Sequence, residues 1–247
     1  MAPEQPELLA PRPGAAGLCA VCRGPSGRGI RCFLCDLHLQ CAPGSLADLV
    51  VPVAYAVKGG AHATHLWQYK SDRAGPRAAD RAGRRLAALL LGFLRDHGGC
   101  AGRAAGIGAP THLAVVPSAR GRPGVHPLRA LIAPQLPGPA GLAPAVPARW
   151  AELTARPDGQ RIRDLDPGRF FAGPVPGARV LLLDDTWVTG SSAQSAAMAL
   201  RRAGALAVVT VVLGRHVGPD DLGAAAMPFR PGTCVVHEAV GLAGDQR

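Results

Sequence analysis

The sequence predicts an α/β fold in which a parallel sheet is flanked by helices and preceded by a small cysteine-rich unit. The first observation is a pair of short, wholly apolar runs, Val180 to Leu183 and Leu206 to Leu213, typical of strands buried on both faces. The second is the helical pattern of Ala193 to Arg202 between them, which completes a strand-helix-strand unit with a right-handed crossover. The third is a doubled Cys-x-x-Cys pattern near the N-terminus, which indicates a separate metal-binding unit.

Composition limits the classes of protein to which the chain can belong. With 247 residues and 48% apolar content it suits one main domain plus an appendage, and no apolar run approaches the length of a membrane span. The net charge is +10, and arginine supplies every basic residue except Lys58 and Lys70. This charge favours polyanions, either a small phosphorylated molecule or a nucleic acid. The ten aromatic residues are too few for the stacking surfaces of the usual single-strand binders.

The N-terminal segment is expected to contain a tail and a metal site. Residues 1–17 are Pro-rich and lack the pattern of a signal peptide, so we expect a flexible tail and a cytoplasmic, reducing location. Residues 18–45 are expected to form a zinc ribbon, with one structural zinc ion held tetrahedrally by Cys19, Cys22, Cys32 and Cys35. The alternatives are a redox dithiol or a site that has lost its metal, and His38 or Cys41 is close enough in the sequence to replace one ligand.

The main domain is expected to span residues 46–217. Val50 to Tyr55 suit a strand or an extended arm, and Ala61 to Lys70 form a short amphipathic segment. A helix is expected next, with its apolar positions at Leu86, Leu89, Leu90, Phe93 and Leu94. We expect Gly98 and Gly99 to end it, which leaves Cys100 isolated and buried. Because lysine is so rare here, Lys70 is a candidate for a specific role.

A second strand and its loop are predicted at His112 to Val116 and Pro117 to Gly124. Ligands of open parallel sheets bind outside the carboxyl ends of strands, so this loop is expected to face the loop that follows Leu183. Arg120 and Arg122 would offer several donors to a diphosphate. The alternative is a surface turn whose arginines have no ligand.

The following segment has weaker signals. Pro127 to Ala133 suit a short helix, and Arg149 to Arg156 suit another core strand. The polar stretch Pro157 to Gly168 is expected to be flexible. It is either a solvated linker or, as the family resemblance described below implies, a mobile loop in which Arg161 or Arg163 would close over a bound anion.

The motif that organises the chain follows the apolar run ending at Leu183. Asp184 and Asp185 are expected to end that strand, and residues 186–192 to form a loop of small hydroxyl-bearing residues with Gly190 in the bend. Backbone N–H groups of such a loop converge on an anion at a helix N-terminus. Two adjacent carboxylates suit the vicinal hydroxyls of a ribose, so the motif predicts a holder for a sugar phosphate. The alternative is an ordinary strand-helix junction with capping Asp and Ser.

The last part of the chain is expected to add little to the site. Arg215 and His216 leave a strand at its carboxyl end and could approach the ligand. Residues 218–247 are expected to be a C-terminal extension. Cys234 and His237, three apart, could bind a metal, but simple packing is preferred.

The run from Val180 to Ser192 resembles the signature of type I phosphoribosyltransferases, which use 5-phosphoribosyl 1-pyrophosphate (PRPP). The order of motifs, four cysteines, then Tyr55 to Lys58, then a Val-Val-Pro-Ser loop, then the Asp-Asp motif, resembles the ComF-like family associated with competence and DNA uptake, and its actinobacterial branch most. The resemblance implies a type I phosphoribosyltransferase fold, a Rossmann-like parallel sheet flanked by helices with an N-terminal zinc ribbon.

The resemblance also implies roles for individual residues. Asp184 and Asp185 would hold the ribose and carry catalysis, and Mg²⁺ would accompany the diphosphate. The residues implied in substrate binding are Thr186, Trp187, Val188, Thr189, Gly190, Ser191 and Ser192 around the 5-phosphate, Ser118, Ala119 and Arg120 around pyrophosphate, and Arg161 in the mobile loop. The reaction would displace pyrophosphate by an amine or base that the sequence does not identify. The alternative is a non-catalytic PRPP sensor or DNA-associated protein, and both a monomer and a homodimer stay open.

One position narrows the acceptor. In enzymes that salvage 6-oxopurines, the phosphate loop carries an Asp two residues before its Gly, which exchanges a proton with the purine ring. Here that position is Val188, which cannot transfer a proton. We therefore predict that hypoxanthine and guanine are not acceptors.

Overall fold

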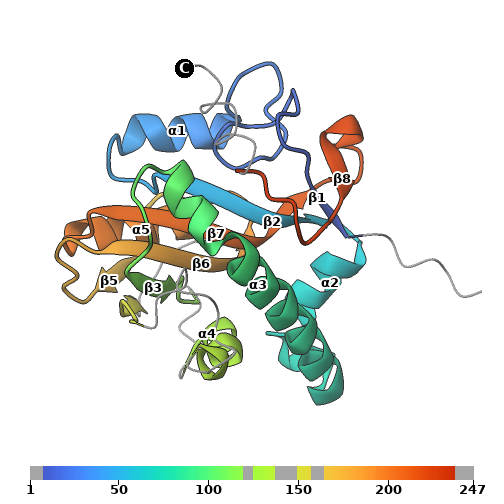
Figure 1. Ribbon diagram of the computed structural model, residues 1–247. Helices are drawn as coiled ribbons and strands as arrows, with labels where there is room; N and C mark the ends of the chain where they lie inside the picture. Colours follow the sequence, from blue (N-terminus) through green and yellow to red (C-terminus); the bar gives the residue numbers. More distant parts are fainter. Residues whose placement is uncertain (1–7, 119–124, 137–148, 157–163, 237–247) are drawn as a thin grey trace, which may run out of the picture.

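A four-stranded parallel sheet forms the centre of the protein (Figure 1). The computed structural model describes residues 8–118, 125–136, 149–156 and 164–236. The sheet has the order β2-β7-β6-β3, and its strands are β2 (Leu49–Val57), β7 (Ala207–Val217), β6 (Arg179–Trp187) and β3 (His112–Val115). The predicted α/β class, a parallel sheet flanked by helices, is confirmed.

Helices cover both faces of this sheet, which explains why its strands are apolar on both sides. α2 (Ala61–Gln68), α3 (Pro76–Ala104) and α4 (Pro127–Ile132) lie on one face, where α3 crosses in front of the strands in Figure 1. α5 (Ser191–Arg202) packs its alanines on the other face, together with the cysteine-rich unit that leads into α1 (Phe33–Cys41). Each face therefore has its own apolar core. Successive residues of β6 alternate between the two cores, as the strand period requires.

The helix α3 is longer than predicted. We expected it to end at Gly98 and Gly99, but it continues to Ala104. Glycine lowers helix stability by about 1 kcal/mol relative to alanine, so tertiary packing must outweigh it. Gly98 and Gly102 are buried, and a β-carbon at Gly102 would collide with the carbonyl oxygen of Gly108. The glycines thus let the end of α3 lie close against the following loop.

Two small antiparallel pairs complete the fold. β1 (Leu9–Pro11) pairs with β8 (Ala226–Pro228), so part of the expected N-terminal tail and part of the expected C-terminal extension form one sheet. Pro11 and Pro228 are tolerated in these strands because both are edge strands, in which a residue need not donate a backbone N–H to a neighbour. The described residues also form short 3-10 helices at η1 (Asp72–Ala74), η2 (Ala133–Gln135) and η3 (Gly223–Ala225).

The segment predicted as a core strand at Arg149 to Arg156 divides in two. Trp150 makes a single parallel bridge to Leu113 of β3, so the chain at Trp150 runs beside the edge of the main sheet without forming a further strand there. The chain then turns into β4 (Leu153–Ala155), which pairs antiparallel with β5 (Phe170–Ala172) outside the main sheet. Across the described ranges, no helix combines the length and the apolar character needed to cross a membrane.

Candidate functional site

A cavity of about 480 Å³ opens where β3 and β6 end. Its walls come from four places: the ends of β3 and β6, the loop into α5, the segment after α2, and the start of α4. The lining residues are Trp67, Lys70, Ser71, Val116, Pro117, Ser118, His126, Pro127, Asp184, Asp185, Thr186, Val188, Thr189, Gly190, Ser191, Ser192 and Ala193. The size is ordinary for a small-molecule site.

The two aspartates stand inside β6 and not after it. Ladder pairing with β7 continues through Asp184, Thr186 and Trp187, which face Val212, Gly214 and Arg215. The strand was expected to end at Asp184 and Asp185, but it continues to Trp187, so Thr186 and Trp187 belong to the strand and not to the loop. The longer strand places both carboxylates at the floor of the cavity, on a part of the backbone fixed by neighbouring strands.

Asp185 is held by partners from the other side of the cavity. The Nζ of Lys70 lies 2.9 Å from each of its carboxylate oxygens, and the hydroxyl of Tyr69 donates to Oδ2. Burial by itself would raise the pKa of Asp185, but the charge of Lys70 and the hydrogen bonds from Tyr69 and Lys70 bring the pKa below its ordinary value. Asp185 is thus an ionised, positioned carboxylate.

Asp184 has the opposite electrostatic environment. Burial and the neighbouring charge of Asp185 raise its pKa to about 7, while Lys70 and two backbone N–H groups oppose the shift. One strand therefore carries two adjacent carboxyl groups whose pKa values are pushed apart. That separation is typical of sites where one carboxyl group must change protonation and the other must stay charged.

The loop from β6 to α5 is short and fixed by its own side chains. Gly190 has φ +84°, and a β-carbon there would collide with the indole ring of Trp187. The hydroxyls of Thr189 and Ser191 lie 2.9 Å apart, and Thr189 Oγ1 accepts from the backbone N–H of Ser191 at 3.3 Å. This bend directs the first turn of α5, with its partial positive charge, into the cavity.

A buried arginine stands behind this loop. Arg169 is 3% exposed and donates to the hydroxyl of Ser192 at 3.4 Å and to the carbonyl of Asp164 at 2.7 Å. Its pKa is lowered by burial, and the charges of Asp166 and Asp164 oppose that shift. The guanidinium adds positive charge beside the N-terminus of α5, where an anion would be stabilised.

The structure brings most of the predicted site residues to this one cavity. Ser118, Asp184, Asp185, Thr186, Val188, Thr189, Gly190, Ser191 and Ser192 all line it. Trp187 does not, because its side chain is 1% exposed and packs beneath the loop. Ala119, Arg120 and Arg161 lie outside the described residues, so the expected pyrophosphate and mobile-loop roles have no structural test.

Sequence reasoning missed some of the residues at the cavity. Trp67, Tyr69 and His126 were not singled out, although Trp67 and His126 line the cavity and Tyr69 holds Asp185. His126 also accepts from the backbone N–H of Leu128 at 3.2 Å and so caps α4. The only available signal was the rarity of lysine, which pointed to Lys70 and thus to the segment that contains Tyr69.

The four N-terminal cysteines form a compact cluster. The sulfur atoms of Cys19, Cys22, Cys32 and Cys35 lie within 4.8 Å of one another, and those of Cys22 and Cys32 are 3.8 Å apart. Tetrahedral ligands at the usual zinc–sulfur distance of about 2.3 Å have a spacing of about 3.8 Å, so the cluster has the dimensions of a four-thiolate site. Neither His38 nor Cys41 belongs to it. Cys41 is exposed, and His38 is buried, with no hydrogen-bond partner for its Nδ1 among the described residues.

Arg215 links this cluster to the cavity loop. Its position at the carboxyl end of a strand left it able to approach the ligand, but it is buried in β7 and is not among the residues that line the cavity. Its Nη1 donates to the carbonyls of Trp187 and Val188 at 3.3 and 3.2 Å. A β-carbon at Gly24, between the two cysteine pairs, would collide with its guanidinium. The cysteine unit thus rests on the side chain that fixes the start of the loop.

Comparisons of the chain with models of protein families, with curated proteins and with solved structures found no match. Any functional conclusion therefore depends on the residues and geometry of the site.

Proposed function

We propose that the protein is a phosphoribosyltransferase-like protein of the type I class that binds PRPP in this cavity and displaces its pyrophosphate with a nitrogen nucleophile. One observation carries the proposal: two adjacent carboxyl groups and a hydroxyl-rich loop at a helix N-terminus line the same cavity. Carboxylates suit ribose hydroxyls and the loop suits a phosphate, so the two halves of one sugar phosphate have complementary partners.

The proposed roles follow from these environments. The first turn of α5 and the hydroxyls of Thr189 and Ser191 hold the 5-phosphate, with Arg169 behind them. Asp185, kept ionised by Lys70, accepts a hydrogen bond from a ribose hydroxyl. Lys70 also brings positive charge to the cavity, where pyrophosphate would leave. Catalysis then rests on positioning and electrostatic stabilisation of an oxocarbenium-like transition state.

Asp184 is proposed as the group that changes protonation. With a pKa of about 7 it can accept a proton from an incoming amine near neutral pH. Asp184 is placed for this proton transfer because it is half-buried and lines the cavity. A Mg²⁺ ion would bind through the diphosphate and would neutralise the charge of the leaving group.

We further propose that the cysteine cluster holds one structural Zn²⁺ ion and forms a zinc ribbon. All four ligand positions would be filled by thiolates, three of which belong to buried cysteines, so the ion would have no open site for catalysis. Its effect on the cavity would pass through Arg215.

Calorimetry with PRPP and Mg²⁺ tests the main proposal. We expect the wild-type protein to bind PRPP and Asp185→Asn to bind it at least ten-fold more weakly at pH 8, since the charge-assisted contact of Asp185 with a ribose hydroxyl contributes about 1.5–3 kcal/mol. Asp220→Asn, an exposed acid outside the cavity, is the matched control and should bind like wild type. Equal affinity in all three proteins would place PRPP elsewhere. PRPP binding without pyrophosphate release, over a panel of amines and bases, would favour the sensor alternative.

A further inference from the structure

A second cluster of potential metal ligands lies far along the chain from the N-terminal cysteines. His97 and Cys100 come from α3, and Cys234 comes from the segment after β8. All three residues are buried, and their ligand atoms lie within 4.8 Å of one another. The sequence pattern suggested that Cys100 is isolated, and the structure corrects this interpretation by placing Cys100 beside Cys234. Cys234 is buried in the apolar core, as the preference for simple packing expected.

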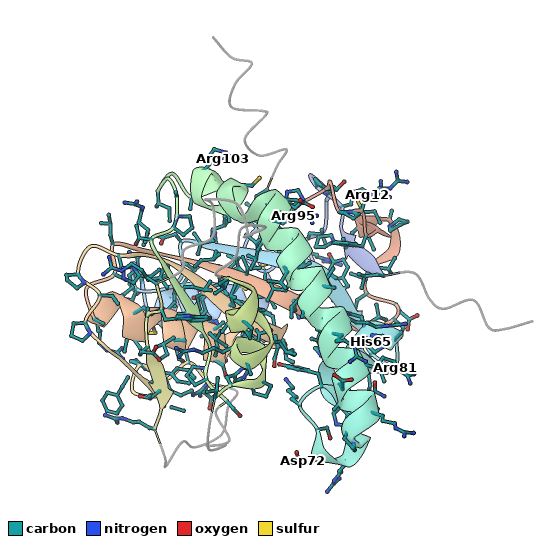
Figure 2. The ribbon with its side chains drawn as sticks, turned by 60° about the horizontal axis from the view of Figure 1, so that its bottom comes forward. Arg12, His65, Asp72, Arg81, Arg95 and Arg103 are labelled. Carbon is teal, nitrogen blue, oxygen red and sulfur yellow. The ribbon has the colours of Figure 1, made fainter. Side chains whose placement is uncertain are left out.

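Helix geometry explains the first pair. Residues three apart face the same side of a helix, so His97 and Cys100 both point from α3 toward the chain that passes over it. Figure 2 shows the end of α3 that carries them, between the labelled Arg95 and Arg103, and the other end near Asp72. The passing chain contributes Cys234 and the carbonyl of Pro231.

The hydrogen bond of His97 decides which of its nitrogens faces the sulfurs. Nε2 lies 2.6 Å from the carbonyl oxygen of Pro231, and a carbonyl can only accept, so Nε2 carries the proton. In the neutral imidazole Nδ1 then presents a lone pair, and it lies 3.9 Å from the sulfur of Cys100. Metal-binding histidines commonly donate their other N–H to a backbone carbonyl in this way.

The spacing and charge suit a metal ion. Nitrogen and sulfur ligands at the usual zinc distances of about 2.1 and 2.3 Å lie about 3.6 Å apart in a tetrahedron, close to the observed separation. The Nη2 of Arg103, a positively charged donor, lies 3.4 Å from the sulfur of Cys100, and outer hydrogen-bond partners of this kind commonly orient metal-binding side chains.

We propose that His97 Nδ1, Cys100 Sγ and Cys234 Sγ bind a second metal ion, a zinc-class divalent cation, separate from the N-terminal cluster. His237 lies outside the described residues, and the assignment rests on these three side chains. Mixed nitrogen and sulfur ligands in buried positions favour zinc over magnesium or calcium.

This ion would have a structural role that the proposed reaction does not require. Cys100 and Cys234 belong to the core under α3, whereas Cys19, Cys22 and Cys35 belong to the core on the opposite face of the sheet. The second ion would fasten the last described segment of the chain to the end of α3. The two ions would therefore stabilise opposite sides of the protein independently.

Metal analysis of protein purified without chelators tests the proposal. We expect two equivalents of zinc per wild-type chain, and one fewer in Cys234→Ser and in Cys100→Ser. Cys41→Ser, which alters an exposed cysteine outside both clusters, should keep the wild-type content. The proposal would be overturned if Cys234→Ser and Cys100→Ser keep the wild-type content, or if mass spectrometry under non-reducing conditions finds Cys100 and Cys234 joined in a disulfide.

A second measurement uses the wild-type protein alone, so it does not depend on how the variants fold. X-ray absorption at the zinc edge should show imidazole scattering beside the sulfur shell, because the N-terminal cluster contains only thiolates. An all-sulfur shell would exclude His97 as a ligand. Neither measurement involves PRPP, so the outcome is separate from that of the proposed reaction.

Discussion

Lys70 and Asp185 form an ion pair that joins the segment after α2 to the middle of the sheet, with both oxygens of Asp185 2.9 Å from Nζ of Lys70. The Asp185 side chain is 8% exposed and that of Lys70 is 35% exposed. Removal of one partner of such a pair leaves the buried partner uncompensated, and this costs more than the pair itself contributes.

Lys70→Met should therefore destabilise the protein by about 1–3 kcal/mol at pH 7, a range reduced for the solvent that screens Lys70. The pKa of Asp185 is lowered in the folded state, so its stabilisation is present at neutral pH and is lost as pH falls through that pKa. The deficit of the variant should accordingly shrink in acid.

Urea unfolding at pH 7 and pH 3.5 measures this difference. Lys58 is the only other lysine and its side chain is exposed, so the Lys58→Met variant should unfold like wild type. A deficit equal at both pH values would mean that Lys70 acts through packing and not through charge.

Asp184→Asn and Asp185→Asn should change stability in opposite directions. The folded pKa of Asp184 is raised to about 7 from an ordinary value of 3.8, so its ionisation in the folded state opposes folding as pH rises across that interval. Asp184→Asn should raise the free energy of unfolding at pH 8, by about 1–3 kcal/mol, and change little near pH 4. Asp185→Asn loses the charge that pairs with Lys70 and should be less stable at pH 8.

Thermal unfolding of both variants at pH 4 and pH 8 tests these two expected changes in stability. Two variants that shift the melting temperature in the same direction at pH 8 would contradict the separate protonation states assigned here.

Removal of the proposed N-terminal zinc should loosen the cavity loop. Cys19→Ser combined with Cys32→Ser is expected to lose one equivalent of zinc and to weaken PRPP binding several-fold, because Arg215 would no longer rest against Gly24. Elemental analysis and calorimetry measure the two effects. Cys41→Ser should show neither, and unchanged zinc in the double variant would rule out the N-terminal site.

The 6-oxopurine bases hypoxanthine and guanine should be poor acceptors. Val188 is 58% exposed in the cavity wall, at the position where a proton-transferring side chain would be needed for 6-oxopurines. The lack of such a group typically lowers the rate by about 10²–10⁴-fold. Incubation with PRPP, Mg²⁺ and hypoxanthine or guanine should give no nucleotide above background in a chromatographic assay. Formation of IMP or GMP at ordinary enzymatic rates would show that another group transfers the proton.

Local patterns predicted the parts of the protein that local interactions decide. The apolar runs that became β3, β6 and β7 are buried on both faces because helices cover them, and Gly190 marks a bend that only glycine fits. The parallel sheet and the shared cavity at its carboxyl edge followed from these signals.

Contacts between distant parts of the chain were not predictable in this way. Lys70 and Asp185 are 115 positions apart, and His97 is 134 positions from Pro231, so no spacing rule relates them. The helix α3 passed Gly98 and Gly99 because buried packing outweighed glycine's low helix propensity. Cys100 was predicted to be isolated for the same reason, because its neighbour Cys234 is distant in the sequence.

The strand order has a consequence for synthesis on the ribosome. Within the described sheet β2 pairs only with β7, and Leu49 aligns with Val209. At about 5–20 residues per second, roughly 8–30 seconds of translation separate these two residues. The nascent apolar strand β2 therefore emerges long before its partner exists, and we expect this segment to be the one that depends most on a chaperone during that interval.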